Sequence, residues 1–95
     1  MSSSQAQRKK QANSVDVVDM AQFVLTELRV GLGLAAFARH ALQKHRFLQA
    51  SSQKARAIQA RECALRFLSQ ATPTREQRAM IERQLARLQD CISNL

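Results

Sequence analysis

The side chains that could carry metal, redox or nucleotide chemistry are few in this sequence, and their spacing is wrong for it. His40 and His45 stand five positions apart. That spacing places them about 140° apart around a helix, whereas two histidines that share a metal on one helix stand four apart. Cys63 and Cys91 form no CxxC pair, and the segment Gly31-Leu32-Gly33 lacks the third glycine and the preceding strand of a dinucleotide-binding loop. We therefore predict no catalytic residue, no metal site, no cofactor and no small-molecule substrate, and we expect that the protein is not an enzyme.

Almost all of the excess positive charge lies in the middle of the chain. Residues 29–68 hold eight basic residues and one acid, Glu62, so this segment contributes +7 of the formal net charge of +8. A fixed field of one sign attracts a partner of the opposite sign. The sequence therefore predicts a partner that presents carboxylates or phosphates.

Length and composition predict one small domain inside the cell. A chain of 95 residues with 4% aromatic residues builds its core mainly from alanine, leucine, valine and isoleucine. Two cysteines make no secreted disulfide framework, and the basic, serine-rich residues 1–13 have no apolar signal sequence. We expect the cytoplasm or nucleus, with the mitochondrion as a further location. The longest uncharged stretch, residues 30–38, is too short to cross a bilayer, so a membrane partner is not expected.

The sequence predicts an all-α fold, because no run of alternating apolar and polar residues outlasts the helical patterns. We expect a disordered basic tail over residues 1–13, followed by a single helical domain over residues 14–95. Its three helices are expected at about 14–30, 34–70 and 73–94, with Ser14 as the first N-cap. Gly31 and Gly33 favour a break or kink between the first two; the alternative is that another helix approaches closely there.

The last helix has the clearest start. Pro73 suits a first helical turn, and Thr74 with Gln77 has the spacing of a capping box. Apolar residues then follow at steps of four and three, which is the rhythm of a coiled-coil seam. We expect this helix to fold back antiparallel onto residues 55–70 and form a C-terminal αα-hairpin, which completes a small three-helix bundle.

Two groups of residues are candidates for binding. The first group is apolar and should make helix–helix contacts, within the chain or as a partner interface: Val17, Val24, Leu28, Ile81, Leu85, Leu88 and Ile92. The second group is basic and falls within about a quarter turn of one continuous helix, where it would face an anionic partner: Arg39, Arg46, Lys54 and Arg61. The alternative for the basic group is that arginine stems lie along the apolar seam with their charged ends in water.

These patterns predict a small protein–protein interaction module. We expect a structural subunit or adaptor whose apolar stripes are covered by a protein partner or by self-association. The alternative is a basic helical protein that contacts the phosphates of nucleic acid, associated with ribosomes or DNA.

Overall fold

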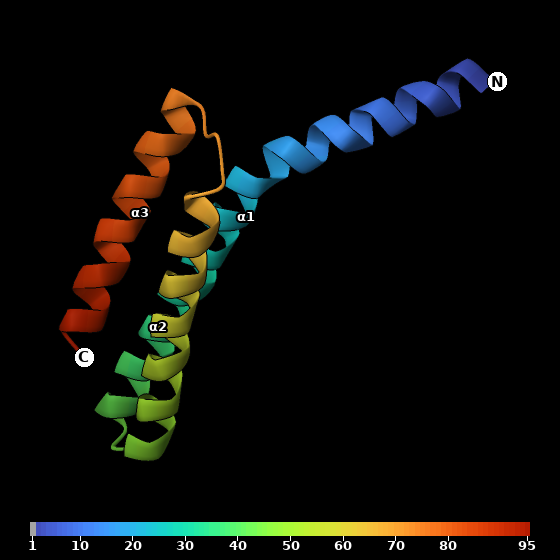
Figure 1. The fold of residues 1–95 in the computed structure, drawn as a ribbon. Helices are drawn as coiled ribbons and strands as arrows, with labels where there is room; N and C mark the ends of the chain where they lie inside the picture. The colour runs from blue at the N-terminus through green and yellow to red at the C-terminus, as the bar shows by residue number, and fades with distance from the viewer. Residues whose placement is uncertain (1) are drawn as a thin grey trace.

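The protein is a bundle of three helices in a computed structural model, which describes the backbone of residues 2–95 and the side chains of residues 20–95. Helix α1 spans Ser2–Gln43, α2 spans Phe47–Leu68 and α3 spans Arg75–Ser93. Figure 1 shows α1 and α2 as an antiparallel pair, with α3 beside them and the first part of α1 extending away from the bundle. No strand occurs in residues 2–95. The predicted all-α three-helix bundle is confirmed.

The first helix begins earlier than the sequence pattern indicated. Because α1 starts at Ser2, residues 2–13 and Ser14 are helical, which differs from the predicted tail and N-cap. The serine, glutamine, alanine, arginine and lysine of this segment tolerate a helix, and no glycine or proline precedes Gly31. The side chains of residues 1–19, including Val17, lie outside the described residues.

No break occurs at the two glycines, so the predicted separation of residues 14–30 and 34–70 into two helices is wrong. Helix α1 runs through both, and Gly31 is buried. A Cβ atom at Gly31 would lie 2.8 Å from Cδ2 of Leu88 and 3.4 Å from Cβ of Ala60. At Gly33 nothing lies within 4 Å of such an atom. Gly31 is therefore the point where all three helices cross, as the alternative of a close helix approach required.

The predicted long helix over residues 34–70 is instead interrupted at Lys44, His45 and Arg46. His45 adopts a positive φ of 59°, in the left-handed region. The backbone N–H of Arg46 donates to the carbonyl of Ala41 at 2.8 Å, and that of His45 donates to Leu42 at 3.0 Å. This pair of bonds is the Schellman motif, in which the left-handed position is usually glycine. Histidine is one of the residues that adopt this conformation more often than most, so the helix ends without a glycine.

Small residues bring α1 and α2 close together. On α1 the buried residues past Gly31 are Ala35, Ala38 and Ala41, and the buried residues of α2 are Ala50, Ala57, Ala60 and Ala64. Alanine faces let two helix backbones approach until the methyl groups interlock, which removes apolar area from water without bulky side chains. The pair α1 and α2 is therefore the tight hairpin of this fold.

Helix α3 packs mainly on α1. It runs antiparallel to α2, as expected, but its contacts with α2 are the fewest of the three helix pairs. We predicted that it would fold onto residues 55–70, and that prediction needs correction. The physical reason is that α2 already turns its alanine face toward α1, so the apolar seam of α3 enters beside α1 instead. The core includes Val24, Leu25 and Leu28 of α1 and Ile81, Leu88 and Ile92 of α3.

The predicted capping box at the start of α3 is confirmed. The backbone N–H of Gln77 donates to Oγ1 of Thr74 at 3.1 Å, and the backbone N–H of Thr74 donates to Oε1 of Gln77 at 2.9 Å. Thr74→Ala removes one of these bonds and is expected to lower the free energy of unfolding by about 1 kcal/mol in urea titrations followed by circular dichroism. Thr72→Ala, an exposed change two residues earlier, is the control and should shift stability by less than about 0.5 kcal/mol. Equal effects of the two variants would show that the cap does not stabilise α3.

Candidate interaction surfaces

The residues predicted as an apolar partner interface mostly form the core of the chain itself. Val24, Leu28, Ile81 and Leu88 are fully buried, and Ile92 is buried with them. Leu85 is half-buried and packs against this core. The chain covers these side chains with its own helices, so they are corrected from a partner interface to a contact between α3 and the hairpin. For Val17 the prediction lies outside the described side chains.

The predicted basic group does not lie on one helix face. Its geometry required a continuous helix, and the turn at His45 places Arg39 on α1, Arg46 in the turn, and Lys54 and Arg61 on α2. Arg39 lines a cavity between α1 and α3 together with Arg87 and Asp90 of α3. The structure therefore divides the predicted anion-facing group among three places and leaves only Lys54 and Arg61 on a shared helix.

A row of exposed apolar side chains on α1 is the first uncovered surface. Phe23, Val30 and Phe37 are spaced by seven residues and are 42%, 48% and 61% exposed. With the half-buried Leu34 they form what we call the α1 stripe. Residues seven apart lie on one side of a helix, so a partner helix could contact all of them at once. Phe23, Val30 and Phe37 were not among the apolar residues predicted to make contacts on this helix, which were Val17, Val24 and Leu28.

The α1 stripe borders a groove on the side of the hairpin away from α3. The groove has a volume of about 260 Å³ and is lined only by residues of α1 and α2: Glu27, Val30, Leu34, Arg56, Gln59, Ala60 and Cys63. At one end of the stripe, the rings of Phe23 and Phe67 meet edge to face with centroids 4.9 Å apart. The hairpin thus has two sides, one covered by the seam of α3 and the other open.

A second row of side chains runs along α2 beside α3. Its members follow one another at steps of four and three residues: Phe47, Ser51, Lys54, Ile58, Arg61 and Leu65. We call this row the α2 row. Nη1 of Arg61 donates to Oε1 of Gln89 on α3 at 2.8 Å, which shows that the row lies next to that helix. Phe47 and Leu65 remain 62% and 45% exposed, so α3 covers the row only in part.

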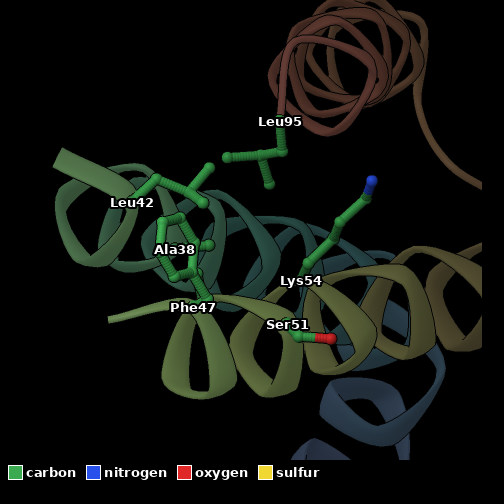
Figure 2. A pocket seen from close by; sticks show the side chains of 7 residues that line it. Ala38, Leu42, Phe47, Ser51, Lys54 and Leu95 are labelled. Atoms are coloured by element: carbon green, nitrogen blue, oxygen red, sulfur yellow. The ribbon is translucent and has the colours of Figure 1, made fainter. Parts of the chain in front are cut away.

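One end of the α2 row opens into an apolar pocket. Figure 2 shows Phe47, Ser51 and Lys54 of α2 facing Ala38 and Leu42 of α1, with Leu95 above them. The pocket has a volume of about 190 Å³, and Ala50 completes its lining. Lys54 is the only charged side chain in this lining. Such a pocket fits an apolar side chain that has an anionic group close to it.

The basic side chains of the described part form no ion pair with the acids of that part. Residues 20–95 contain twelve lysines and arginines and five acids, and no ion pair within 4.0 Å joins any two of these described side chains. Exposed ion pairs contribute little to stability, so their absence costs the fold little. The twelve basic residues outnumber the five acids, so the described part has a net positive charge, which attracts anionic molecules.

Comparisons with known proteins were made for the whole chain. No family model, no curated protein and no solved structure matches it. We therefore infer a function from the surfaces described above.

The residues with metal or redox chemistry are not brought together. Cys63 lines the groove beside the α1 stripe, whereas Cys91 lines the cavity between α1 and α3, and both are free thiols. Within the described residues, no three histidine, cysteine or acidic side chains are placed to hold a metal ion. His40 is exposed on α1 and His45 lies in the turn.

One segment of α1 contradicts the prediction, drawn from the longest uncharged stretch, that no part of the chain is long enough to cross a bilayer. Residues Met20–Gln43 of α1 are long and apolar enough to cross a bilayer, judged by length and composition alone. The physical reason for the difference is that a span tolerates a few charged residues within it. A core helix of a bundle passes the same test, and 33% of the most apolar window is buried inside this fold. Phe23, Val30 and Phe37 of the α1 stripe lie in this segment and are exposed.

Proposed function

We propose that this protein is a small structural subunit or adaptor that binds a helix of another protein, or of a second copy of itself, along the α1 stripe. The observation that carries the proposal is the seven-residue spacing of Phe23, Val30 and Phe37 on the open side of the hairpin. Contiguous exposed apolar side chains mark interaction sites in small proteins, because leaving them in water is unfavourable.

The fold itself provides an example of the contact that we propose. On its other side, the hairpin already binds α3 through a seam of Ile81, Leu85, Leu88 and Ile92, which follow each other at steps of four and three. A helix with the same spacing on the open side would complete a four-helix arrangement. The function that this supports is assembly into a larger complex and not catalysis.

A second candidate is binding to nucleic acid through phosphate contacts. The observation that favours it is the set of unpaired basic side chains in residues 20–95. Phosphate binding by exposed lysine and arginine weakens steeply as salt concentration rises, whereas an apolar helix interface does not. Salt dependence therefore separates the two candidates.

Val30→Asp tests the proposed interface. A carboxylate buried without a partner opposes binding strongly, so we expect the apparent Kd of the assembly to rise at least about 100-fold. Val30 is about half exposed in the isolated fold, so helicity and melting temperature should stay close to the parent protein. The measurement is molar mass by size-exclusion chromatography with light scattering, on the purified protein and on complexes from its native cells, at low and high salt.

Gln22→Asp is the matched control, because it adds the same charge to an exposed position of α1 away from the stripe. It should leave the mass of the assembly unchanged. The proposal is wrong if Val30→Asp also leaves that mass unchanged. A monomer that carries nucleic acid, released by high salt, would support the second candidate instead.

A further inference from the structure

We propose that the α2 row binds an acidic amphipathic helix of a partner protein, with apolar side chains in the pocket beside Phe47 and carboxylates on Lys54 and Arg61. This inference concerns a different surface from the α1 stripe and does not depend on it. The row lies on the side of the hairpin that carries α3, and the stripe lies on the open side.

The apolar part of the row fits side chains of another helix. Phe47, Ile58 and Leu65 stand eleven and seven residues apart, which keeps them on one side of α2. The pocket of about 190 Å³ at the Phe47 end has room for a leucine or phenylalanine side chain. Figure 2 shows Leu95 of the C-terminal end on one side of this pocket, with Phe47 and Ser51 of α2 on the other. An inserted side chain would exclude water from Phe47, which is 62% exposed without it.

The basic residues of the row indicate that the partner carries negative charge. Lys54 and Arg61 are half-buried within the same row, and neither is within 4.0 Å of a described carboxylate. Within residues 20–95, the only side-chain partner of Arg61 is the neutral amide of Gln89. The only acid in residues 28–68 is Glu62, and it forms no ion pair within 4.0 Å with either of these two cations. Carboxylates of a partner would form charge-assisted hydrogen bonds here, at the partly dehydrated edge of the apolar row.

The order of residues favours a helix over nucleic acid. From Lys54 to Leu65, basic and apolar positions alternate at steps of four and three, which matches the side chains of one face of another helix. A nucleic acid backbone would satisfy Lys54 and Arg61 but would leave Ile58 and Leu65 against phosphates and sugars. Bases stack on aromatic rings, and Phe47 is the only aromatic residue in the row. The partner that fits is a helix with leucines and glutamates in the corresponding order.

The test uses the full protein and a designed peptide as the probe. The peptide is as long as α2 and carries leucine, alanine, glutamate, leucine, glutamate and leucine at the spacing of the row. A second peptide has lysine in place of the two glutamates. We expect the parent protein to prefer the acidic peptide in titration calorimetry. Lys54→Glu with Arg61→Glu should weaken acidic-peptide binding about tenfold or more and should reverse the preference toward the lysine peptide.

The matched control is Arg29→Glu with Arg66→Glu, which changes the net charge equally at two exposed positions outside the row. It should keep the preference for the acidic peptide within about threefold of the parent. Lys54→Glu alone is measured as well, because Arg61 bonds to α3 and its replacement could disturb the fold. Circular dichroism checks each variant.

The possible results separate the inference from its competitors. A reversed preference in the row variant, together with an unchanged control, supports it. Equal weakening by both double variants would mean bulk charge attraction and would overturn it, as would a parent protein that binds neither peptide. Tighter binding of a single-stranded oligonucleotide than of the acidic peptide, lost in the row variant, would assign the row to nucleic acid. Val30→Asp should change none of these affinities, so failure here is distinct from failure of the α1 interface.

Discussion

Leu88→Asp is expected to detach α3 and unfold most of the protein. The side chain of Leu88 is fully buried at the crossing of the three helices, next to Gly31. A carboxylate there would have no partner among the surrounding apolar side chains. Water could reach it only if the core opened, so the folded state would lose stability. We expect a loss of at least about 4 kcal/mol in the free energy of unfolding, which is close to the whole stability of a small domain.

Urea titration followed by circular dichroism measures this loss, with Ala86→Asp as the matched control. Ala86 is exposed on the same helix two positions away, and its replacement adds the same charge. The control should change stability by less than about 0.5 kcal/mol. A Leu88→Asp protein as stable as the control would mean that α3 does not pack as described.

Gly31→Ala and Gly33→Ala are expected to have opposite effects, although the two changes are chemically identical. Either one raises helix propensity by about 1 kcal/mol. At Gly33 the new methyl group meets nothing within 4 Å, so that gain should appear in full as added stability. At Gly31 the methyl group would lie 2.8 Å from Cδ2 of Leu88, so this fully buried side chain would have to shift within the core.

Overpacking of this kind costs about 1–3 kcal/mol, which outweighs the gain in propensity at Gly31. We therefore expect Gly31→Ala to be less stable than Gly33→Ala by about 2 kcal/mol, a difference that thermal unfolding of both variants resolves. Gly31→Leu should separate the helices further and expose the core to a hydrophobic dye. If both alanine variants stabilise the protein equally, the close crossing at Gly31 is incorrect.

The parts of the fold that the sequence predicted are those that depend on local chemistry. The helical class follows from the periodicity of apolar residues, and the start of α3 follows from the side chains of Thr74 and Gln77, which act on neighbouring backbone groups. The buried positions of α3 also follow from their steps of four and three. These features need no knowledge of how the helices are arranged.

The parts that the sequence did not predict depend on contacts between helices. Gly31 favours a break in an isolated helix, and only the approach of Leu88 and Ala60 makes a missing side chain useful there. The turn at His45 has no glycine or proline to mark it, so residues 34–70 read as one helix. That error also produced the predicted cluster of Arg39, Arg46, Lys54 and Arg61, because its geometry assumed a continuous helix.

The candidate surfaces also depend partly on local sequence and partly on contacts between helices. The positive charge of the middle segment was visible in the sequence, but the separation of the α1 stripe from the α2 row requires the position of α3. Once α3 covers one side of the hairpin, the apolar residues of α1 divide into a buried set and an exposed set. Val24 and Leu28 belong to the first, and Val30 and Phe37 to the second.

The most direct test of the proposed assembly is photo-crosslinking from the α1 stripe in the native cells. A photoreactive phenylalanine analogue at Val30 should form a specific adduct with one polypeptide, identified by mass spectrometry as a partner protein or a second copy. The same analogue at Gln22, exposed on α1 outside the stripe, should not form it. Adducts of equal yield from both positions, or adducts from Val30 only with nucleic acid, would contradict the account of this protein as a helical subunit or adaptor.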